Sequence, residues 1–265
     1  MQFLNVIAVL STIIGNALAN ILPFNGVYTG TVADAYPSLF TPPGYVFAIW
    51  GVIYTLLFIF MVYQVRSSQQ GADYIRQIGV LFLIGAVFNN VWLVMFHYSY
   101  PAPSPLFPLT TVPIALLLVT LLLTYLRLGI GKKAVPLSER LAVHLPVGVY
   151  LGWISLATIA NIASTLNALV VGIPTETQEL ATVSVILVAL LLTLLITHRR
   201  HEFAFGLVVI WASVGIAVKQ AAHFIILFTA LGTAVSIAVA LIVVPVLPAL
   251  RKHFVGFYLL RNTEA

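Results

Sequence analysis

Residues 180–197 read LATVSVILVALLLTLLIT and contain no charged side chain. They are followed directly by His198-Arg199-Arg200-His201, a short basic group. An apolar run of about 20 residues with basic residues at one end is typical of a transmembrane helix. Strands of a membrane barrel would alternate apolar and polar side chains, which this run does not do. The stretch therefore predicts an all-α protein that spans the bilayer.

The composition extends this conclusion to the whole chain. Of its 265 residues, 61% are hydrophobic and 7% are charged, whereas soluble domains carry about 25% charged residues. The net charge is +5, but the basic residues stand in short groups between apolar runs, a pattern that reports membrane topology. Nucleic acid is therefore not an expected partner. The absence of cysteine excludes disulfides, thiolate catalysis and sulfur-ligated metals.

Apolar stretches of suitable length predict a bundle of about eight transmembrane helices. They are centred in residues 3–22, 45–65, 75–96, 106–128, 141–166, 180–197, 204–221 and 224–248. In a seven-helix alternative, the last two stretches form one long bent segment. With eight helices, every lysine and arginine except Lys219 falls on one side of the membrane. By the positive-inside rule, this places both termini in the cytoplasm.

The longest structured connection is the first outer loop, residues 23–44, which is rich in proline and glycine. These residues favour an irregular but ordered path rather than a helix. A loop of this length with several aromatic residues is more typical of a lid than of a spacer. The candidate lid residues are Tyr36, Phe40, Pro42 and Pro43.

Three of the predicted helices carry aromatic and polar residues at helical spacing, so that each set shares one face. An asparagine in a membrane helix is expected to point into the bundle. There it either bonds another helix, as a packing device, or orients a ligand between aromatic walls. The residues on these faces are Trp50 and Tyr54 in the second helix, Asn89, Trp92 and Phe96 in the third, and Tyr150, Trp153, Ala157 and Asn161 in the fifth.

Three stretches carry a resemblance to a known family. They read PPGYVFAIWGVIY (42–54), NNVW (89–92) with Phe96 four residues on, and YLGWISLATIAN (150–161). They resemble the signatures of the TspO/MBR family of tryptophan-rich sensory proteins and translocator proteins. The resemblance covers about residues 1–170, the family's five-helix unit, and the whole chain is similar to the longer bacterial members. The resemblance implies that residues 1–170 form a five-helix bundle and that residues 171–265 form three additional helices with a short cytoplasmic tail. It also implies that the protein lies in a bacterial inner membrane.

The resemblance also implies a function. Family members bind porphyrins, haem or sterol-like molecules in an aromatic cavity beneath the first loop. We therefore expect the residues on the three faces to bind a tetrapyrrole or a similar hydrophobic ligand, for sensing or transport. Two alternatives stay open: a structural or assembly subunit of a larger membrane or pigment complex, and light-dependent modification of a bound porphyrin. The sequence leaves a homodimer or a larger membrane complex open as the assembly. Apart from a porphyrin or haem ligand, the sequence predicts no cofactor, metal site or conventional catalytic residue.

Three other features have simpler interpretations. His97, at the end of its predicted helix, is expected to be solvated at the membrane interface rather than to bind haem. Lys219 is expected to extend to the outer surface, with a site for an anion or proton beside Glu176 or Glu179 as the alternative. The basic segment 198–201 is expected to anchor the chain to anionic lipid.

Overall fold

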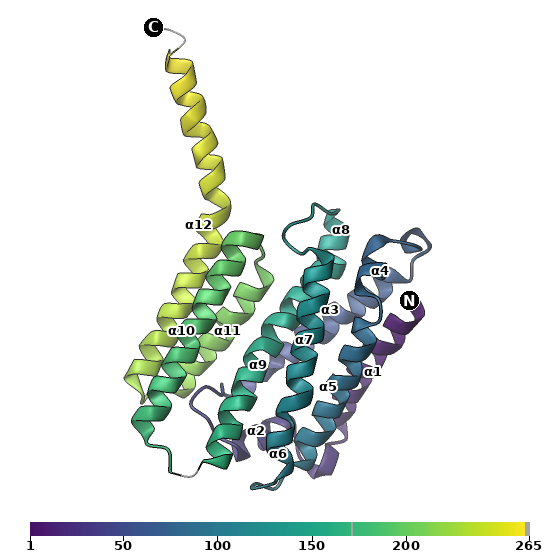
Figure 1. Cartoon of the computed structure of the whole chain (residues 1–265), viewed down its shortest axis with the longest axis vertical. Coiled ribbons are helices and arrows are strands. Elements are labelled where there is room, and N and C mark those ends of the chain that lie inside the picture. Colours follow the sequence, from purple (N-terminus) through teal and green to yellow (C-terminus); the bar gives the residue numbers. More distant parts are fainter. Residues whose placement is uncertain (171, 263–265) are drawn as a thin grey trace.

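The computed structural model describes residues 1–170 and 172–262, with the side chains of residue 20 and of residues 247–262 left aside. This part of the chain is helical, without strands, as predicted (Figure 1). Its longest helices run antiparallel to their neighbours along the chain. They are α1 Gln2–Ile21, α3 Ile49–Gln64, α5 Leu81–Tyr98, α7 Thr111–Leu128, α9 Leu145–Leu169, α10 Thr175–Arg200, α11 Ala204–Lys219 and α12 Phe224–Asn262.

The described segments settle how the last two apolar stretches are connected. Residues 220–223 form a turn that separates α11 from α12, so they are not one bent helix. Among the described residues, seven helical segments are long and apolar enough to cross a membrane, and the one that contains α3 begins at Gly44 and has 21 residues. Helix α11, with 16 residues, is shorter than these segments. A helix of this length spans about 24 Å, less than the hydrocarbon thickness of about 30 Å. α11 is nevertheless placed inside the bundle, because it packs against both α9 and α12.

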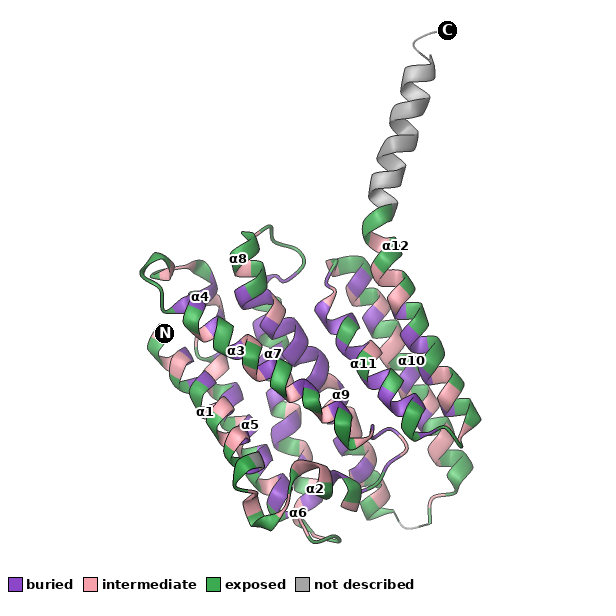
Figure 2. Ribbon diagram, turned by 180° about the vertical axis from the view of Figure 1, so that it is seen from behind, coloured by how far each residue is buried: buried purple, intermediate pink, exposed green. Residues whose placement is uncertain are grey.

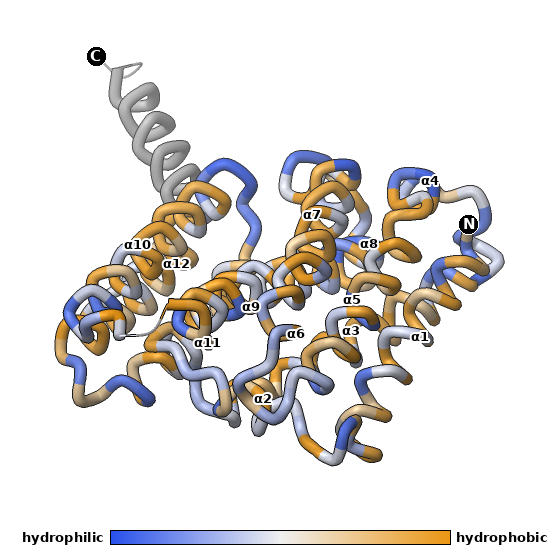
Figure 3. The backbone as a smooth tube through the Cα atoms, turned by 60° about the horizontal axis from the view of Figure 1, so that its bottom comes forward, coloured by the Kyte–Doolittle hydropathy of each residue, from blue (hydrophilic) through white to orange (hydrophobic). Residues whose placement is uncertain are grey.

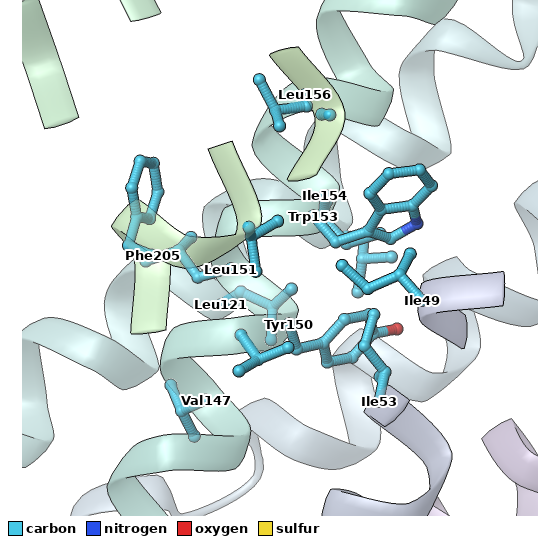
Figure 4. Close-up of a cluster of buried hydrophobic side chains, with 14 of the residues drawn as sticks. Ile49, Ile53, Leu121, Val147, Tyr150, Leu151, Trp153, Ile154, Leu156 and Phe205 are labelled. Carbon is cyan, nitrogen blue, oxygen red and sulfur yellow. The ribbon is translucent and has the colours of Figure 1, made fainter. Parts of the chain in front are cut away.

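Helix α9 is the central element of the described fold. In an apolar 18-residue stretch of its span, 78% of the residues are buried, against 22% for α10. Helix α9 packs against α7 on one side and α11 on another (Figure 2). Figure 4 shows Tyr150 and Trp153 directed toward Ile49 and Ile53, with Phe205 on the opposite side. The helix that carries the stretch YLGWISLATIAN therefore joins the four long helices before it to the last three.

Short elements connect the long helices, and they correct two predictions. The first outer loop is not free of helix, because α2 spans Thr29–Ala35. The third predicted stretch, 75–96, is two helices, since Gly79 adopts a positive φ of 54° that ends α4 before α5 begins. The short elements are η1 Phe24–Gly26, α2, η2 Gly44–Ala48, η3 Ser67–Gln69, α4 Asp73–Ile78, α6 Leu106–Leu109, α8 Leu137–Glu139 and the π-helical turn η4 Arg140–His144.

Hydrophilic segments gather at the two ends of the helices (Figure 3). The N-terminus, α4, α8 and the turn after α10 lie at one end, and α2 and α6 lie at the other (Figure 1). The basic residues of the connections are thus brought to one end, and the candidate lid lies at the opposite end. Arg251, Lys252 and Arg261, which also supported the predicted orientation, lie outside the side chains that the structure describes.

Candidate ligand cavity

Three tryptophans from three helices converge near the lid end of the bundle. The ring centres of Trp50 on α3 and Trp153 on α9 are 6.1 Å apart, with the planes at 83°. Trp92 on α5 stacks on Phe96 at 4.9 Å, and Trp50 stacks on Tyr54 at 5.6 Å. Edge-to-face and stacked arrangements at these distances are favourable for aromatic pairs. The helical spacing in the sequence therefore corresponds to one aromatic cluster in space.

A small cavity of about 50 Å³ lies within this cluster. Six of the residues on the three predicted faces line it, together with Tyr36 from the lid. Ala157 and Ala160 of α9 line the side of the cavity opposite the aromatic rings. Larger side chains at these two positions would fill the cavity. The six are Trp50, Trp92, Phe96, Trp153, Ala157 and Asn161.

A larger groove of about 510 Å³ adjoins the cavity. It runs between α1, α2, α3 and α5, and Tyr54 lines it. Phe47, Trp50 and Trp92 line both spaces. These three aromatic side chains are therefore the partition between the small cavity and the larger groove.

The other predicted residues lie outside the cavity wall. The hydroxyl of Tyr150 donates a hydrogen bond to Oδ1 of Asn89, at 3.1 Å, and both residues are buried beside the aromatic cluster. Phe40 lines a separate apolar groove between α9 and α10. Pro42 and Pro43 lie against α11 instead, where a Cβ at Gly215 would contact both prolines.

Asn161 has its polar partners within the bundle. Its Oδ1 accepts hydrogen bonds from the hydroxyls of Thr110, at 3.2 Å, and Thr111, at 2.8 Å. Its Nδ2 lies 3.0 Å from the Thr110 hydroxyl oxygen. The amide thus ties α9 to the start of α7 while one side of the residue faces the cavity. The sequence allowed two possible roles for such an asparagine, a hydrogen bond to another helix or contact with a ligand. These hydrogen bonds correspond to the first role.

Three buried donors at the cluster have no hydrogen-bond partner among the described residues. They are Nε1 of Trp92, Nε1 of Trp153 and Nδ2 of Asn89. A buried N–H group without a partner costs about 1–3 kcal/mol, so such groups are normally satisfied. Two of the three belong to residues that line the cavity. An acceptor group on a bound molecule could satisfy them.

The lid is held by hydrogen bonds to the end of α5. The hydroxyl of Tyr36 donates to the carbonyl oxygen of Ser99, at 2.6 Å, and its ring stacks on Phe107 with the centres 3.6 Å apart. Burial raises the pKa of Tyr36 above its ordinary value of 10.0. Nδ2 of Asn25 donates to the carbonyl oxygen of Tyr100, at 2.7 Å. The lid therefore has an ordered path, as its composition predicted.

His97 is part of this attachment, and the prediction of interfacial solvation was wrong. The residue is fully buried. Its Nδ1 lies 2.8 Å from the carbonyl oxygen of Leu93, which can only accept, so Nδ1 carries a proton. In the neutral ring, Nε2 then accepts from the hydroxyl of Thr29 on α2, at 3.3 Å. Helix α2, which lies in the lid, covers this end of α5 and removes the ring from solvent.

Helix α11 contacts the lid at the point where α3 begins, and sequence reasoning missed this contact. Nε1 of Trp211 donates to the carbonyl oxygen of Val46, at 3.0 Å, and its ring packs edge-on against Tyr45. Nζ of Lys219 lies 3.6 Å from Oδ1 of Asp34 and 3.5 Å from the carbonyl oxygen of Pro42. One signal in the sequence could have indicated this contact, because Lys219 was the single basic residue predicted for the outer side of the membrane. The sequence, however, suggested Glu176 or Glu179 as its neighbour.

Those acidic residues do not pair with Lys219. Oε1 of Glu179 lies 2.6 Å from Nδ1 of His223, so this carboxylate joins α10 to the start of α12. Glu176 makes no ion pair within the described part of the chain. The structure therefore does not place Lys219 beside Glu176 or Glu179, as the suggested anion or proton site required. Lys219 instead attaches α11 to the lid.

Comparison with known proteins agrees with this architecture. No curated protein and no solved structure matches the chain. A family model described as TSPO-like protein matches residues 2–243. The match begins in α1, includes the whole aromatic cluster and continues through α11 into α12. Because it covers far more than half of the sequence, this multi-pass membrane protein belongs to the TSPO-like protein family.

Proposed function

We propose that the chain binds a flat hydrophobic small molecule of the tetrapyrrole class, porphyrin or haem, for sensing or transport. The ligand would lie at the partition formed by Phe47, Trp50 and Trp92. The observation that carries the proposal is the pairing of aromatic faces with unpartnered donors at one place. Indole faces can stack on a flat ring, and movement of this partition would let Nε1 of Trp92 and of Trp153, both buried without a partner, donate to a carboxylate on the edge of the ring.

The size of the two spaces decides how such a ligand would fit. Ligand pockets occupy about 300–1,000 Å³, so the small cavity of about 50 Å³ does not hold a tetrapyrrole. The adjoining groove of about 510 Å³ reaches that range. The macrocycle would therefore occupy the groove, and an edge would reach the two indole donors only if the partition moved. Trp50 is the partition residue with the most influence, since its ring contacts Tyr54, Tyr150 and Trp153.

Binding can be measured from the ligand's own absorption, so that loss of tryptophan fluorescence does not confuse the result. Protoporphyrin IX is titrated into the purified protein in mild detergent, and the shift of its main absorption band is followed. The test variant is Trp50→Leu, which removes the shared wall. The matched control is Phe58→Leu on the same helix, because Phe58 is exposed on the outer face.

We expect the Trp50→Leu variant to bind at least tenfold more weakly, consistent with the loss of about 1.4 kcal/mol of stacking and burial. The control should bind like the wild type. Equal affinity in all three proteins would show that porphyrin binds elsewhere, for example on the lipid-facing surface. Absence of any spectral shift in the wild type would reject the tetrapyrrole class.

Contacts of α11 support a division of the chain into two parts. We propose that residues 1–170 form the ligand-binding unit and that residues 171–265 support its lid. Trp211 and Lys219 of α11 both contact the lid segment, which supports this division. We also propose that both termini face the cytoplasm of a bacterial inner membrane, since the basic connections gather at the N-terminal end.

A further inference from the structure

A second concave site lies at the basic end of the bundle, opposite to the lid. It is a pocket of about 490 Å³ with walls from two distant parts of the sequence. Residues 130–135 and the π-helical turn η4 form one wall, and residues 200–204, between α10 and α11, form the other. The pocket therefore spans the junction between the proposed ligand-binding unit and the last three helices.

Four permanent cations surround this pocket: Lys132, Lys133, Arg140 and Arg200. The first three are exposed, and their side chains make no hydrogen bond or ion pair with any residue that the structure describes. Nη1 of Arg200 donates to the carbonyl oxygen of Ile130, at 3.1 Å. This bond fixes one cation at the wall and leaves its remaining donors available.

A buried histidine supplies the second observation that points to a ligand. His144 lines the pocket, yet the residue is only 5% exposed. Its Nε2 has no hydrogen-bond partner within the described residues. A buried ring nitrogen without a partner is costly, and this one belongs to a pocket lined by cations. An anionic oxygen in the pocket would provide the missing partner.

The same pocket contains one carboxylate, Glu202, and its role is structural. Oε1 accepts from the backbone N–H of Ala204, at 2.9 Å, and Oε2 accepts from that of Phe205, at 3.0 Å. Glu202 thus caps the first turn of α11. Burial raises the pKa of this carboxyl, which the two backbone hydrogen bonds and Arg140 lower in part. One capped carboxylate leaves the pocket with an excess of positive charge.

Gly131 allows the two walls to approach each other. Its φ is +76°, a conformation that favours glycine. A Cβ at this position would overlap the backbone carbonyl group of Arg200. The loop after α7 can therefore close against the end of α10 only with glycine here, and this closure completes the rim of the pocket.

We propose that this pocket binds a phosphate group, held by Lys132, Lys133 and Arg140 with His144 beneath it. Guanidinium and ammonium groups form short charge-assisted hydrogen bonds to phosphate oxygens. The pocket lies at the end of the membrane-spanning helices, where headgroups are found, and basic pockets between helices on the cytoplasmic side suit anionic headgroups. The phosphate can belong to such a lipid or to a soluble anion, and the two sources predict different results.

The proposal is tested by calorimetric titration of the full-length protein in mild detergent with three probes. Short-chain phosphatidylglycerol carries an anionic headgroup, short-chain phosphatidylcholine carries a zwitterionic one, and inorganic phosphate lacks acyl chains. The test variants are Lys132→Gln/Lys133→Gln, which alters only exposed side chains, and His144→Phe, which removes the unpartnered nitrogen. The matched control is Arg127→Gln, an exposed basic residue at the same end of the molecule that does not line the pocket.

We expect phosphatidylglycerol to bind and the double lysine variant to weaken its affinity by about 30-fold, since each basic residue near the surface contributes about a factor of 5. His144→Phe should weaken it by about tenfold, and Arg127→Gln should leave it unchanged. Stronger binding of the lipid than of inorganic phosphate assigns the site to a headgroup, whereas equal binding assigns it to soluble phosphate. Equal affinities in the wild type and the lysine variant, or no binding of either anion, would overturn the proposal.

Discussion

Nε1 of Trp211 donates a hydrogen bond to the carbonyl oxygen of Val46, at 3.0 Å. Val46 precedes α3 and lies beside the prolines of the lid, whereas Trp211 is in the middle of α11. A Cβ at Gly215, one turn along α11, would overlap the side chain of Val46. The short helix α11 therefore approaches the start of α3 closely and fixes it by one directional bond.

Removing this bond should loosen the segment that leads into α3. In the Trp211→Phe variant, the ring remains but the donor is lost, so the carbonyl oxygen of Val46 loses its side-chain partner. We expect a loss of about 1 kcal/mol of stability and faster amide hydrogen exchange in residues 42–48. The control is Val218→Ala, an exposed position on the same helix. Unchanged exchange in the Trp211 variant would mean that packing alone holds the segment.

The ion pair between Lys219 and Asp34 should contribute little. The charged atoms are 3.6 Å apart, but the Asp34 side chain is 70% exposed, and exposed pairs typically contribute about 0.2–1 kcal/mol. A double-mutant cycle with Lys219→Gln and Asp34→Asn measures the coupling energy from thermal unfolding in detergent. We expect a value below about 1 kcal/mol that falls as salt is raised to 1 M. A larger, salt-insensitive coupling would contradict a surface attachment.

The hydrogen bond between Tyr150 and Asn89 should contribute more to stability than the exposed ion pair, because both of its groups are buried. Tyr150→Phe removes the donor to Oδ1 of Asn89, whose Nδ2 is already unpartnered. The amide would then be buried without a partner, at a cost of about 1–3 kcal/mol. Replacing both residues, with Asn89→Leu added, should recover much of the lost stability, since no orphaned polar group remains. Additive losses in the double variant would exclude this explanation.

The lid should respond to alkaline pH through Tyr36. Burial raises its pKa above 10.0, so the neutral hydroxyl that donates to Ser99 is favoured in the folded protein. Its contribution to stability is complete below pH 10 and is lost as the pH rises through the raised value. Tyr36→Phe, which has no hydroxyl, should remove this dependence. The measurement is the apparent melting temperature between pH 8 and 12 for both proteins, and parallel curves would contradict the prediction.

The absence of cysteine makes the predicted topology directly testable. Ser67→Cys and Thr175→Cys introduce single thiols at exposed positions, near opposite ends of the bundle. In intact cells, a maleimide that cannot cross the inner membrane should label Thr175→Cys only. After permeabilisation, both should react. The reverse pattern would place the termini outside.

The sequence by itself determined which parts of the chain enter the membrane and which residues share a helix face. Hydropathy is a sum over neighbouring residues, so the run 180–197 predicts a helix without knowledge of its surroundings. The spacing of Trp50, Trp92 and Trp153 placed them on the faces that converge in the bundle. The family model then matched well beyond the residues that carried the resemblance.

Only the tertiary structure decided which groups become partners across helices. In lipid, apolar faces do not identify their neighbours by the hydrophobic effect, so close packing and hydrogen bonds select the contacts. Trp211 meets Val46, and His97 is buried beneath α2, because α11 and the lid approach those points. The basic pocket likewise joins residues 130–144 to residues 200–204 through one close approach at Gly131. Such contacts depend on the placement of whole helices, which no local pattern encodes.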